Sequence, residues 1–278
     1  MYSAVILTLN EERALPACLA SLRGCDDIVI LDSGSTDSTV SLARAAGARV
    51  FVRPFDTFAG QRNYALKSIV FRNPWVLHLD ADERMTPELD AECKAASGRT
   101  DLDGFRIAPK MMFEGRWVRH CTDYPAYQAR LVRLPGFEFI QVGHGQRESP
   151  AMRTENMRSS YLHDISIYGV ASWIQKHRGY AKAEAAHVAD AESQAARPWG
   201  ALVSGSALTR RRALKRLSFS LPLRPVFRFI YQYILRLGFL DGRQGLRYCL
   251  LLARYEGFIS EEIAKIREGN KVSHPSES

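Results

Sequence analysis

Asp80 and Asp82 are the residues whose type and spacing point most directly to chemistry. They flank Ala81 at the end of the apolar run 75–79. Two carboxylates at the tip of a buried strand are costly unless something positive occupies the site. Carboxylate oxygens suit Mg²⁺ or Mn²⁺, and such ions commonly bridge to phosphate oxygens. The alternative is a solvated acidic turn, since aspartate also favours turns and helix N-caps.

Residues 3–95 supply the elements that must position this pair. Short apolar runs at 4–7, 28–31, 50–52 and 75–79 predict strands, and helical spacing around Leu42 and over 59–69 predicts helices between them. Such alternation is typical of a parallel sheet with helices on both faces. Three polar loops, 8–12, 32–37 and 80–82, would then end at the same edge, where open α/β sheets bind ligands. We therefore expect a ligand site there, although each loop alone could be a helix cap.

The remaining chain has a different pattern. Short segments between 103 and 148, broken by glycine and proline, predict irregular strands and loops over one face of the sheet. Helical patterns return at 168–196 and again, as two or three helices, over 201–268. We expect a catalytic domain over 1–196, with a nucleotide-binding part to about 100 and an acceptor part over 101–196. A basic amphipathic helical region, 197–270, and a polar tail, 271–278, would follow.

Composition and missing motifs limit the partners and enzyme classes that fit this sequence. The formal net charge of +8 indicates an anionic partner: a nucleotide, a nucleic acid or a membrane surface. The five scattered cysteines read as reduced thiols of a cytoplasmic protein, and neither a signal peptide nor a transmembrane run is recognised. No GxGxxG or P-loop occurs, which disfavours dinucleotide oxidoreductases and P-loop NTPases. No RNA-binding signature occurs either, so we expect no nucleic-acid partner.

Four segments carry a resemblance to a known family. In order and spacing they resemble family 2 glycosyltransferases of the GT-A fold, and within it the bacterial subgroup that includes lipopolysaccharide core β-glucosyltransferases. The segments are Thr8-Leu9-Asn10-Glu11-Glu12, Asp32-Ser33-Gly34-Ser35-Thr36-Asp37, Gln61-Arg62-Asn63 and Asp80-Ala81-Asp82-Glu83. The resemblance is closest over 3–90, extends to about 190 and returns at 237–242. It implies a mostly parallel α/β sheet followed by a helical C-terminal extension.

The resemblance also implies residue roles. Asp82 would coordinate the metal, and Asp80 would face the metal or the ribose. Asp32 would read the uracil edge, for which a carboxylate that accepts the ring N–H is suitable. Arg62 would contact the diphosphate or the base, unless it is a surface arginine. The remaining nucleotide-binding residues would be Thr8, Asn10, Glu11, Ser33 and Gly34.

The chemistry also needs a base, and a histidine is expected as a further metal contact. A carboxylate base must take the proton of the acceptor hydroxyl. The subgroup has a His-Glu pair where this chain reads Gly143-His144-Gly145-Gln146-Arg147-Glu148, so Glu148 would be the base, with Arg147 where the histidine is expected. Asp123 and Glu138 are the alternatives. His163 would be a third metal ligand, unless it is a buried structural histidine.

The resemblance implies an inverting, metal-dependent transfer from a nucleotide sugar, a UDP-sugar, with Mg²⁺ or Mn²⁺. The acceptor would be a saccharide or glycolipid in the synthesis of lipopolysaccharide or another cell-envelope glycan. A polyprenyl-phosphate or protein acceptor is an alternative. A sugar nucleotidyltransferase has less support, because the loop at 8–12 is acidic and lacks a glycine-rich basic triphosphate motif.

The C-terminal third is basic and apolar together. A cluster at 210–216 precedes a polar stripe formed by Arg224, Arg228, Gln232 and Arg236 among aliphatic and aromatic residues. Such helices suit an anionic membrane surface. We expect residues 201–260 to contact the inner face of the cytoplasmic membrane. The alternative is a helix packed on the catalytic domain or on a second copy in a homo-oligomer, with its arginines in water.

Overall fold

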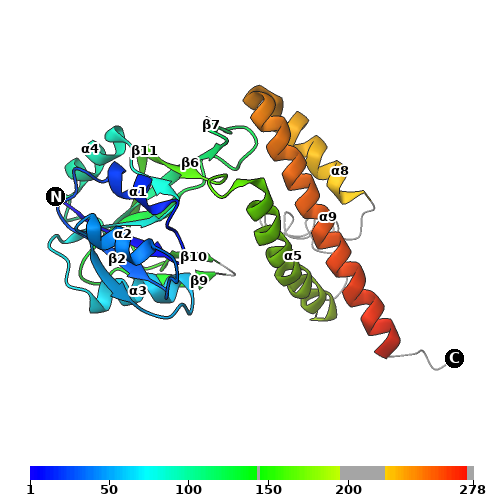
Figure 1. Cartoon of the computed structure of the whole chain (residues 1–278), viewed down its shortest axis with the longest axis horizontal. Coiled ribbons are helices and arrows are strands. Elements are labelled where there is room, and N and C mark those ends of the chain that lie inside the picture. Colours follow the sequence, from blue (N-terminus) through cyan, green and yellow to red (C-terminus); the bar gives the residue numbers. More distant parts are fainter. Residues whose placement is uncertain (143–144, 195–222, 274–278) are drawn as a thin grey trace. The chain divides into compact units, whose positions relative to one another are not determined.

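The computed structural model describes residues 1–142, 145–194 and 223–273 (Figure 1). The chain forms two compact units. The first comprises Met1–Trp117 and Asp123–Ile167, and the second comprises Val118–Thr122 and Tyr168–Ser278.

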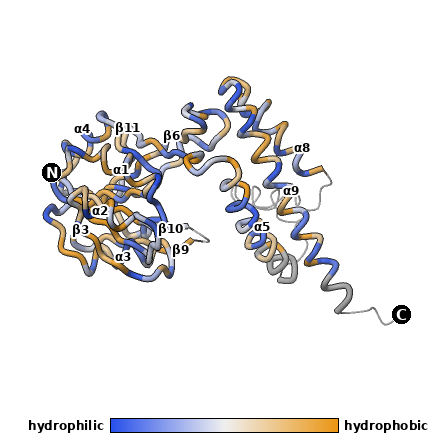
Figure 2. The backbone as a smooth tube through the Cα atoms, in the orientation of Figure 1, coloured by the Kyte–Doolittle hydropathy of each residue, from blue (hydrophilic) through white to orange (hydrophobic). Residues whose placement is uncertain are grey.

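Four parallel strands form the first half of the sheet in the first unit. They are β1 (Ser3–Thr8), β2 (Ile28–Asp32), β3 (Arg49–Val52) and β4 (Trp75–Asp80). The helices between and after them are α1 (Leu15–Ser21), α2 (Thr39–Ala45), α3 (Phe58–Ser68) and α4 (Pro87–Ala96). Hydrophobic residues concentrate along the central strands (Figure 2), as expected where helices cover both faces. These four strands confirm the alternation predicted for residues 3–95.

Residues 103–148 were expected over one face of the sheet, and this expectation is wrong. Strand β6 (Gly104–Phe113) and strand β8 (Gln128–Arg133) join the sheet itself, next to β4, and β11 (Thr154–Asp164) follows β6. Residues 129–132 of β8 are all buried, because neighbours cover both of its faces. The sheet order is β3-β2-β1-β4-β8-β6-β11-β5, with β7 (Arg116–Trp117) paired to β6. The β4–β8 and β8–β6 pairs are antiparallel, so the sheet is mixed beyond its parallel first half.

The sheet curls so that its last strand returns to the end of β4. Strand β5 (Glu83–Arg84) directly follows the turn at Asp80–Asp82, yet it pairs with β11, where Glu83 lies opposite His163. Strands β9 (Phe139–Val142) and β10 (Gly145–Glu148) form a separate two-stranded sheet. The curl therefore brings β11 to the acidic turn.

The register confirms that the three polar loops meet at one edge. Thr8 of β1 lies opposite Asp32 of β2, and Leu7 lies opposite Asp80 of β4. The first loop, the second loop and the acidic turn thus leave adjacent strands at the same level.

The second unit is helical. Helices α5 (Gly169–Gln194) and α9 (Gly242–Ser273) share a core of Ala181, Ala185, Val188, Phe258, Ile259 and Ile263. Between them lie α8 (Arg224–Phe229), the π-helix η1 (Ile230–Leu235) and the 3₁₀ helix η2 (Gly238–Asp241). Because α5 packs on α9, the boundary between the two compact units follows Ile167, whereas the catalytic domain was expected to extend to 196. The basic cluster at 210–216 lies outside the described residues.

The polar stripe of the C-terminal region faces inward, contrary to expectation. Arg224 pairs with Glu256 of α9 at 2.8 Å, and Arg228 lies 4.0 Å from the same carboxylate. Gln232 is buried, and Arg236 donates to the carbonyl of Thr122 at 2.6 Å. The stripe was expected in contact with water or lipid, but these side chains bind other parts of the helical unit instead. No described helix is both long enough and apolar enough to cross a bilayer.

The segment 118–122 belongs to the helical unit because Asp241 binds it. The Asp241 carboxylate accepts hydrogen bonds from the backbone N–H groups of His120 and Cys121 at 2.8 and 2.9 Å. Cys121 also lies 3.4 Å from Cys249 of α9, sulfur to sulfur, and all five cysteines of the chain are free thiols. The close approach of η2 to α9 depends on Gly245, whose added Cβ would meet the Gly238 carbonyl and lie 2.7 Å from the Asp241 Cβ.

Gly245→Ala should therefore destabilise the protein by roughly 1–3 kcal/mol through overpacking. Gly257→Ala, on the same helix, is the matched control: its added Cβ would lie 3.7 Å from Pro225, an ordinary contact. The control should be neutral or stabilising by up to about 1 kcal/mol, because alanine favours helix. Thermal unfolding followed by circular dichroism measures both, and equal behaviour of the two variants would contradict the packing argument.

Candidate active site

Asp32 organises the loop that follows β2. One carboxylate oxygen accepts from the hydroxyls of Thr8 and Ser35 at 2.8 and 2.6 Å. The other accepts from the backbone N–H groups of Gly34 and Ser35 at 2.9 and 2.7 Å. Asp32 is 1% exposed. Burial alone would raise its pKa, but the hydrogen bonds outweigh burial and hold the pKa below its usual value.

The first and second loops are braced against each other. The Asn10 side-chain oxygen accepts from the backbone N–H of Thr36 at 2.9 Å, and the Asn10 N–H donates to Ser35 at 2.8 Å. The Glu11 N–H donates to the hydroxyl of Thr39 at 2.7 Å. Asn10 has a φ of 56°, a left-handed conformation that asparagine tolerates better than most residues. The structure thus brings together the six residues expected to bind the nucleotide from these loops: Thr8, Asn10, Glu11, Asp32, Ser33 and Gly34.

The role of Asp32 as the uracil reader stays a prediction. All four of its hydrogen bonds come from the protein, so a base N–H would have to replace one of them or add to them. Gly34 is exposed, with a φ of 97° and open space where a side chain would lie. The geometry therefore favours Asp32 as the residue that shapes the loop, and the exposed loop backbone as the surface that a ligand meets.

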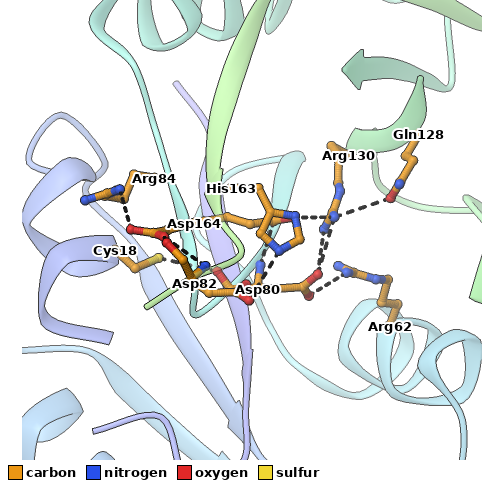
Figure 3. A network of polar contacts seen from close by, with 11 residues as sticks. Cys18, Arg62, Asp80, Asp82, Arg84, Gln128, Arg130, His163 and Asp164 are labelled. Carbon is orange, nitrogen blue, oxygen red and sulfur yellow. Dashed lines mark hydrogen bonds and ion pairs between the residues drawn. The ribbon is translucent and has the colours of Figure 1, made fainter. Parts of the chain in front are cut away.

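Two buried arginines hold Asp80 at the end of β4. One Asp80 oxygen binds Nη2 of Arg62 at 2.8 Å, and the other lies 3.3 Å from Nη2 of Arg130 (Figure 3). Burial opposes ionisation of Asp80, but the two guanidinium charges dominate and lower its pKa. Asp80 is therefore an ionised carboxylate whose charge is already met from within the protein.

Arg62 extends from α3 and is 0% exposed, so its interpretation as a surface arginine is wrong. Its Nη2 is bound to Asp80, while Nε and Nη1 are buried with no hydrogen-bond partner in the described part of the chain. A direct contact of Arg62 with the diphosphate stays a prediction.

Asp82 and His163 form the second polar group of the turn. His163 Nε2 lies 3.3 Å from a carboxylate oxygen of Asp82, and both side chains are about a quarter exposed. Burial would lower the pKa of His163, but the hydrogen bond to Asp82 and the nearby carboxylates raise it to about 9. A cation between Asp82 and His163 would take the place of that imidazole proton.

The donor atoms of this pair fit a shared divalent ion. Two ligand atoms at right angles, each about 2.1 Å from Mg²⁺ or Mn²⁺, are about 3.0 Å apart, close to the observed 3.3 Å. Among the described residues, no group of three or more histidines, cysteines and carboxylates is arranged to hold a metal ion. Asp82 and His163 would therefore share the ion with substrate oxygens and water, which is the usual arrangement for an ion that binds phosphates.

Glu83 and Arg130 are part of the site that sequence reasoning missed. Arg130 Nη2 binds Glu83 at 2.7 Å, and the other Glu83 oxygen accepts the backbone N–H of Asp80 at 2.8 Å. Burial raises the pKa of Glu83 to about 7, although Arg130 opposes the shift. A signal existed for Arg130: a lone arginine inside the apolar run Ala129-Arg130-Leu131-Val132 needs a buried partner.

The three candidate bases lie apart from the acidic turn in the sequence. Glu148 ends β10, and its carboxylate lies 3.7 Å from Arg106 of β6 with 21% of the side chain exposed. Glu138 and Asp123 are exposed. Gly143 and His144 lie outside the described residues. The assignment of the base therefore stays a prediction.

Asp32→Asn should lower the free energy of unfolding by about 1.5–3 kcal/mol at neutral pH, because four hydrogen bonds to a buried charge are weakened. The pKa of Asp32 is lower in the folded than in the unfolded chain. Its stabilisation is thus present above about pH 4 and is lost as the pH falls further, so the two proteins should converge in acid. Asp26→Asn, at an exposed position before the other end of β2, is the control and should change stability by less than about 0.5 kcal/mol. Urea unfolding at several pH values measures this, and a difference independent of pH would contradict it.

Residues 3–145 match the family model described as glycosyl transferase family 2. The lipopolysaccharide core biosynthesis glycosyltransferase LpsC of Rhizobium meliloti is 42% identical over 114 residues, which cover 38% of this chain and 41% of LpsC. An uncharacterized glycosyltransferase of Rickettsia typhi is 38% identical over 117 residues, covering 41% of this chain and 39% of that protein. The chain thus spans about two-fifths of the length of these two relatives. An uncharacterized glycosyltransferase of Mycobacterium bovis is 30% identical over 177 residues, covering 61% of this chain and 79% of that protein.

Two solved structures resemble this chain only distantly. Staphylococcus aureus TarS 1–349 in complex with UDP-GlcNAc gives a TM-score of 0.42 at 15% identity, covering 96% of this chain and 92% of that one. Mycobacterium tuberculosis glucosyl-3-phosphoglycerate synthase, in complex with Mn²⁺, UDP and glucosyl-3-phosphoglycerate, gives 0.32 at 24% identity, covering 41% and 44%. The family assignment comes from the sequence match, which covers more than half of the 278 residues and includes all three polar loops. The chain belongs to glycosyl transferase family 2, as its loop motifs predicted.

Proposed function

We propose that this enzyme transfers a sugar from a nucleotide donor, a UDP-sugar, to a saccharide or glycolipid acceptor of lipopolysaccharide or another cell-envelope glycan. One observation carries the proposal: the acidic turn lies beside two braced polar loops at one sheet edge, with a carboxylate and an imidazole spaced for a divalent ion. The named function of LpsC, lipopolysaccharide core biosynthesis, supports the choice of acceptor class.

Asp82 and His163 would hold Mg²⁺ or Mn²⁺. When bound, the ion would stabilise the negative charge that develops on the departing diphosphate. Asp80, kept ionised by Arg62 and Arg130, remains about one-third exposed in its side chain. It is therefore suited to accept a hydrogen bond from a ribose hydroxyl at the same edge.

Inversion would follow from a single displacement at the anomeric carbon, for which a carboxylate removes the proton of the acceptor hydroxyl. We assign this role to Glu148, whose partly exposed carboxylate lies near the cationic Arg106. Asp123 and Glu138 are the alternatives if Glu148 is not required.

Calorimetric titration with UDP and with GDP, each with and without Mn²⁺, tests the donor site. UDP should bind in a Mn²⁺-dependent manner and GDP should not. Asp82→Ala should weaken Mn²⁺-dependent binding of UDP by at least about tenfold, since even indirect ligand supports contribute this much. Glu148→Gln is the matched control, which should bind UDP as the wild type does but lose sugar transfer. Binding of neither nucleotide, or unchanged binding by Asp82→Ala, would contradict the proposed site.

We further propose that the helical unit docks on an anionic membrane surface through an apolar face. This face is formed by exposed residues of α8, η1, η2 and the first half of α9: Val226, Phe227, Ile230, Tyr231, Ile234, Leu235, Leu237, Phe239, Leu240, Leu246 and Leu250. The Leu235 side chain, for example, is 69% exposed, although leucine is normally buried. Contiguous exposed apolar side chains usually mark a surface that contacts a partner or a membrane.

Charge favours lipid as the occupant of this face. Arg243, Arg247 and Arg254 are exposed on α9 and recur on the same side as Leu246 and Leu250. Apolar side chains interleaved with arginines suit the interface of a bilayer that contains anionic lipid. The sequence led us to expect that the stripe with Arg224 and Arg228 contacts the membrane. Because that stripe packs against Glu256, the proposed contact uses the apolar face instead.

Sedimentation with vesicles of phosphatidylcholine, with and without phosphatidylglycerol, tests the docking face. The protein should bind the anionic vesicles more strongly. The double variant Leu235→Glu/Phe239→Glu should lose most of this binding, because both side chains are apolar and exposed. Val70→Glu is the control, since Val70 is 85% exposed but lies in the other unit. Vesicle binding that the double variant retains, or a self-associated protein that does not bind vesicles, would overturn the proposal.

A further inference from the structure

We propose that Glu83, held by Arg130, positions His163 so that its Nε2 faces the cation site beside Asp82. The inference deepens the proposed function and depends on it, because it concerns the cation that Asp82 and His163 would share. Neither Glu83 nor Arg130 would touch that cation or the sugar donor.

Strand pairing sets the geometry. Glu83 of β5 lies directly opposite His163 of β11, so the backbone fixes the distance between the two residues. The Oε1 atom of Glu83 lies 3.7 Å from Nδ1 of the imidazole, while Nε2, on the other side of the ring, lies 3.3 Å from Asp82. The two ring nitrogens therefore face two different carboxylates.

The chemistry of imidazole gives these two contacts different roles. A histidine that ligates a metal through one nitrogen usually donates the N–H of its other nitrogen to a carboxylate, carbonyl or water. When a cation takes the place of the Nε2 proton, the Glu83 carboxylate beside Nδ1 favours keeping the remaining proton on Nδ1, and the Nε2 lone pair is then directed toward the side of Asp82. Asp82 can then share the cation with His163.

Burial explains why Glu83 supports the site and Asp82 binds the ion. Glu83 is 0% exposed, and its two oxygens accept hydrogen bonds from Arg130 Nη2 and from the Asp80 N–H. The Asp82 side chain, in contrast, is 24% exposed. Glu83 is thus committed to protein donors and has no open face toward a ligand.

Arg130 fixes Glu83 in turn. Its guanidinium is buried and binds Asp80 (Figure 3). It also binds Glu83 and lies over the ring of Tyr161 at 5.1 Å. A planar guanidinium fixed on three sides holds the Glu83 carboxylate in one orientation. The orientation of the imidazole therefore depends on a residue of β8 that is 33 positions away in the sequence.

Mn²⁺ affinity in the presence of UDP, measured by electron paramagnetic resonance of free Mn²⁺, tests the inference in a double-mutant cycle. Glu83→Gln should weaken Mn²⁺ binding by about tenfold to a hundredfold, the usual effect of losing such a support. In the His163→Ala background the same change should have no further effect, because the residue it positions is gone. A purely electrostatic effect of the lost charge would persist in that background and would overturn the inference.

Asp27→Asn is the matched control. Asp27 is a buried carboxylate in the same unit that pairs with Arg49 at 2.8 Å, and it lies at the start of β2, at the opposite end of the strand from Asp32. Asp27→Asn should cost stability as Glu83→Gln does but leave Mn²⁺ affinity unchanged. If Asp27→Asn weakens Mn²⁺ binding equally, Glu83 has only a general structural role.

Two further results separate the inference from the proposed function. If the wild type binds Mn²⁺ and His163→Ala weakens it, but Glu83→Gln does not, only the positioning role of Glu83 fails. If the wild type with UDP does not bind Mn²⁺, the proposed metal site fails and the inference fails with it. Should Glu83→Gln not fold, Arg130→Lys keeps the charge but loses the guanidinium fork, and it should show the same dependence on His163.

Discussion

The pairing of buried charges at the end of β4 is the interaction on which the site depends. Arg62 and Arg130 are almost wholly buried, and each needs Asp80 or Glu83 to offset the cost of leaving water. Because the partners come from α3, β4, β5 and β8, the pairing holds these elements in one arrangement. Removal of one partner would leave an uncompensated charge in the protein, so the sequence is constrained at all four positions together.

This pairing divides the carboxylates of the turn into two classes. Asp80 and Glu83 have their charge met by protein cations, whereas Asp82 pairs with His163 and stays partly accessible to solvent. A ligand can therefore reach the turn at Asp82 and His163, the pair whose side chains are partly exposed. A cation that also contacts phosphate oxygens would satisfy both Asp82 and a diphosphate.

Local patterns predicted the first half of the sheet and its loops, because strands buried on both faces are continuous apolar runs and their polar ends are visible in the sequence. The second half was expected as irregular strands and loops over one face of the sheet, because breakers such as Gly115, Pro125 and Pro135 interrupt the pattern. These residues lie between or after the strands β6, β7 and β8. The contacts of Asp80 with Arg130 and of Asp82 with His163 span 50 and 81 positions, and periodicity carries no information on such pairs. Only the closure of the sheet through β5 and β11 makes them neighbours.

In the helical unit, too, periodicity does not show which long-range partner a side chain meets. Periodicity correctly placed Arg224, Arg228 and Gln232 on one side of a helix, but it could not tell which side faces inward. Glu256 decides this, because a carboxylate on α9 makes the interior favourable for Arg224 and leaves the aliphatic and aromatic side chains outside. A surface of this kind is unfavourable in water, and its burial gains free energy roughly in proportion to the apolar area covered. With the proposed water-soluble donor and an acceptor that carries lipid, docking of this surface on the bilayer would concentrate the protein where the acceptor is found.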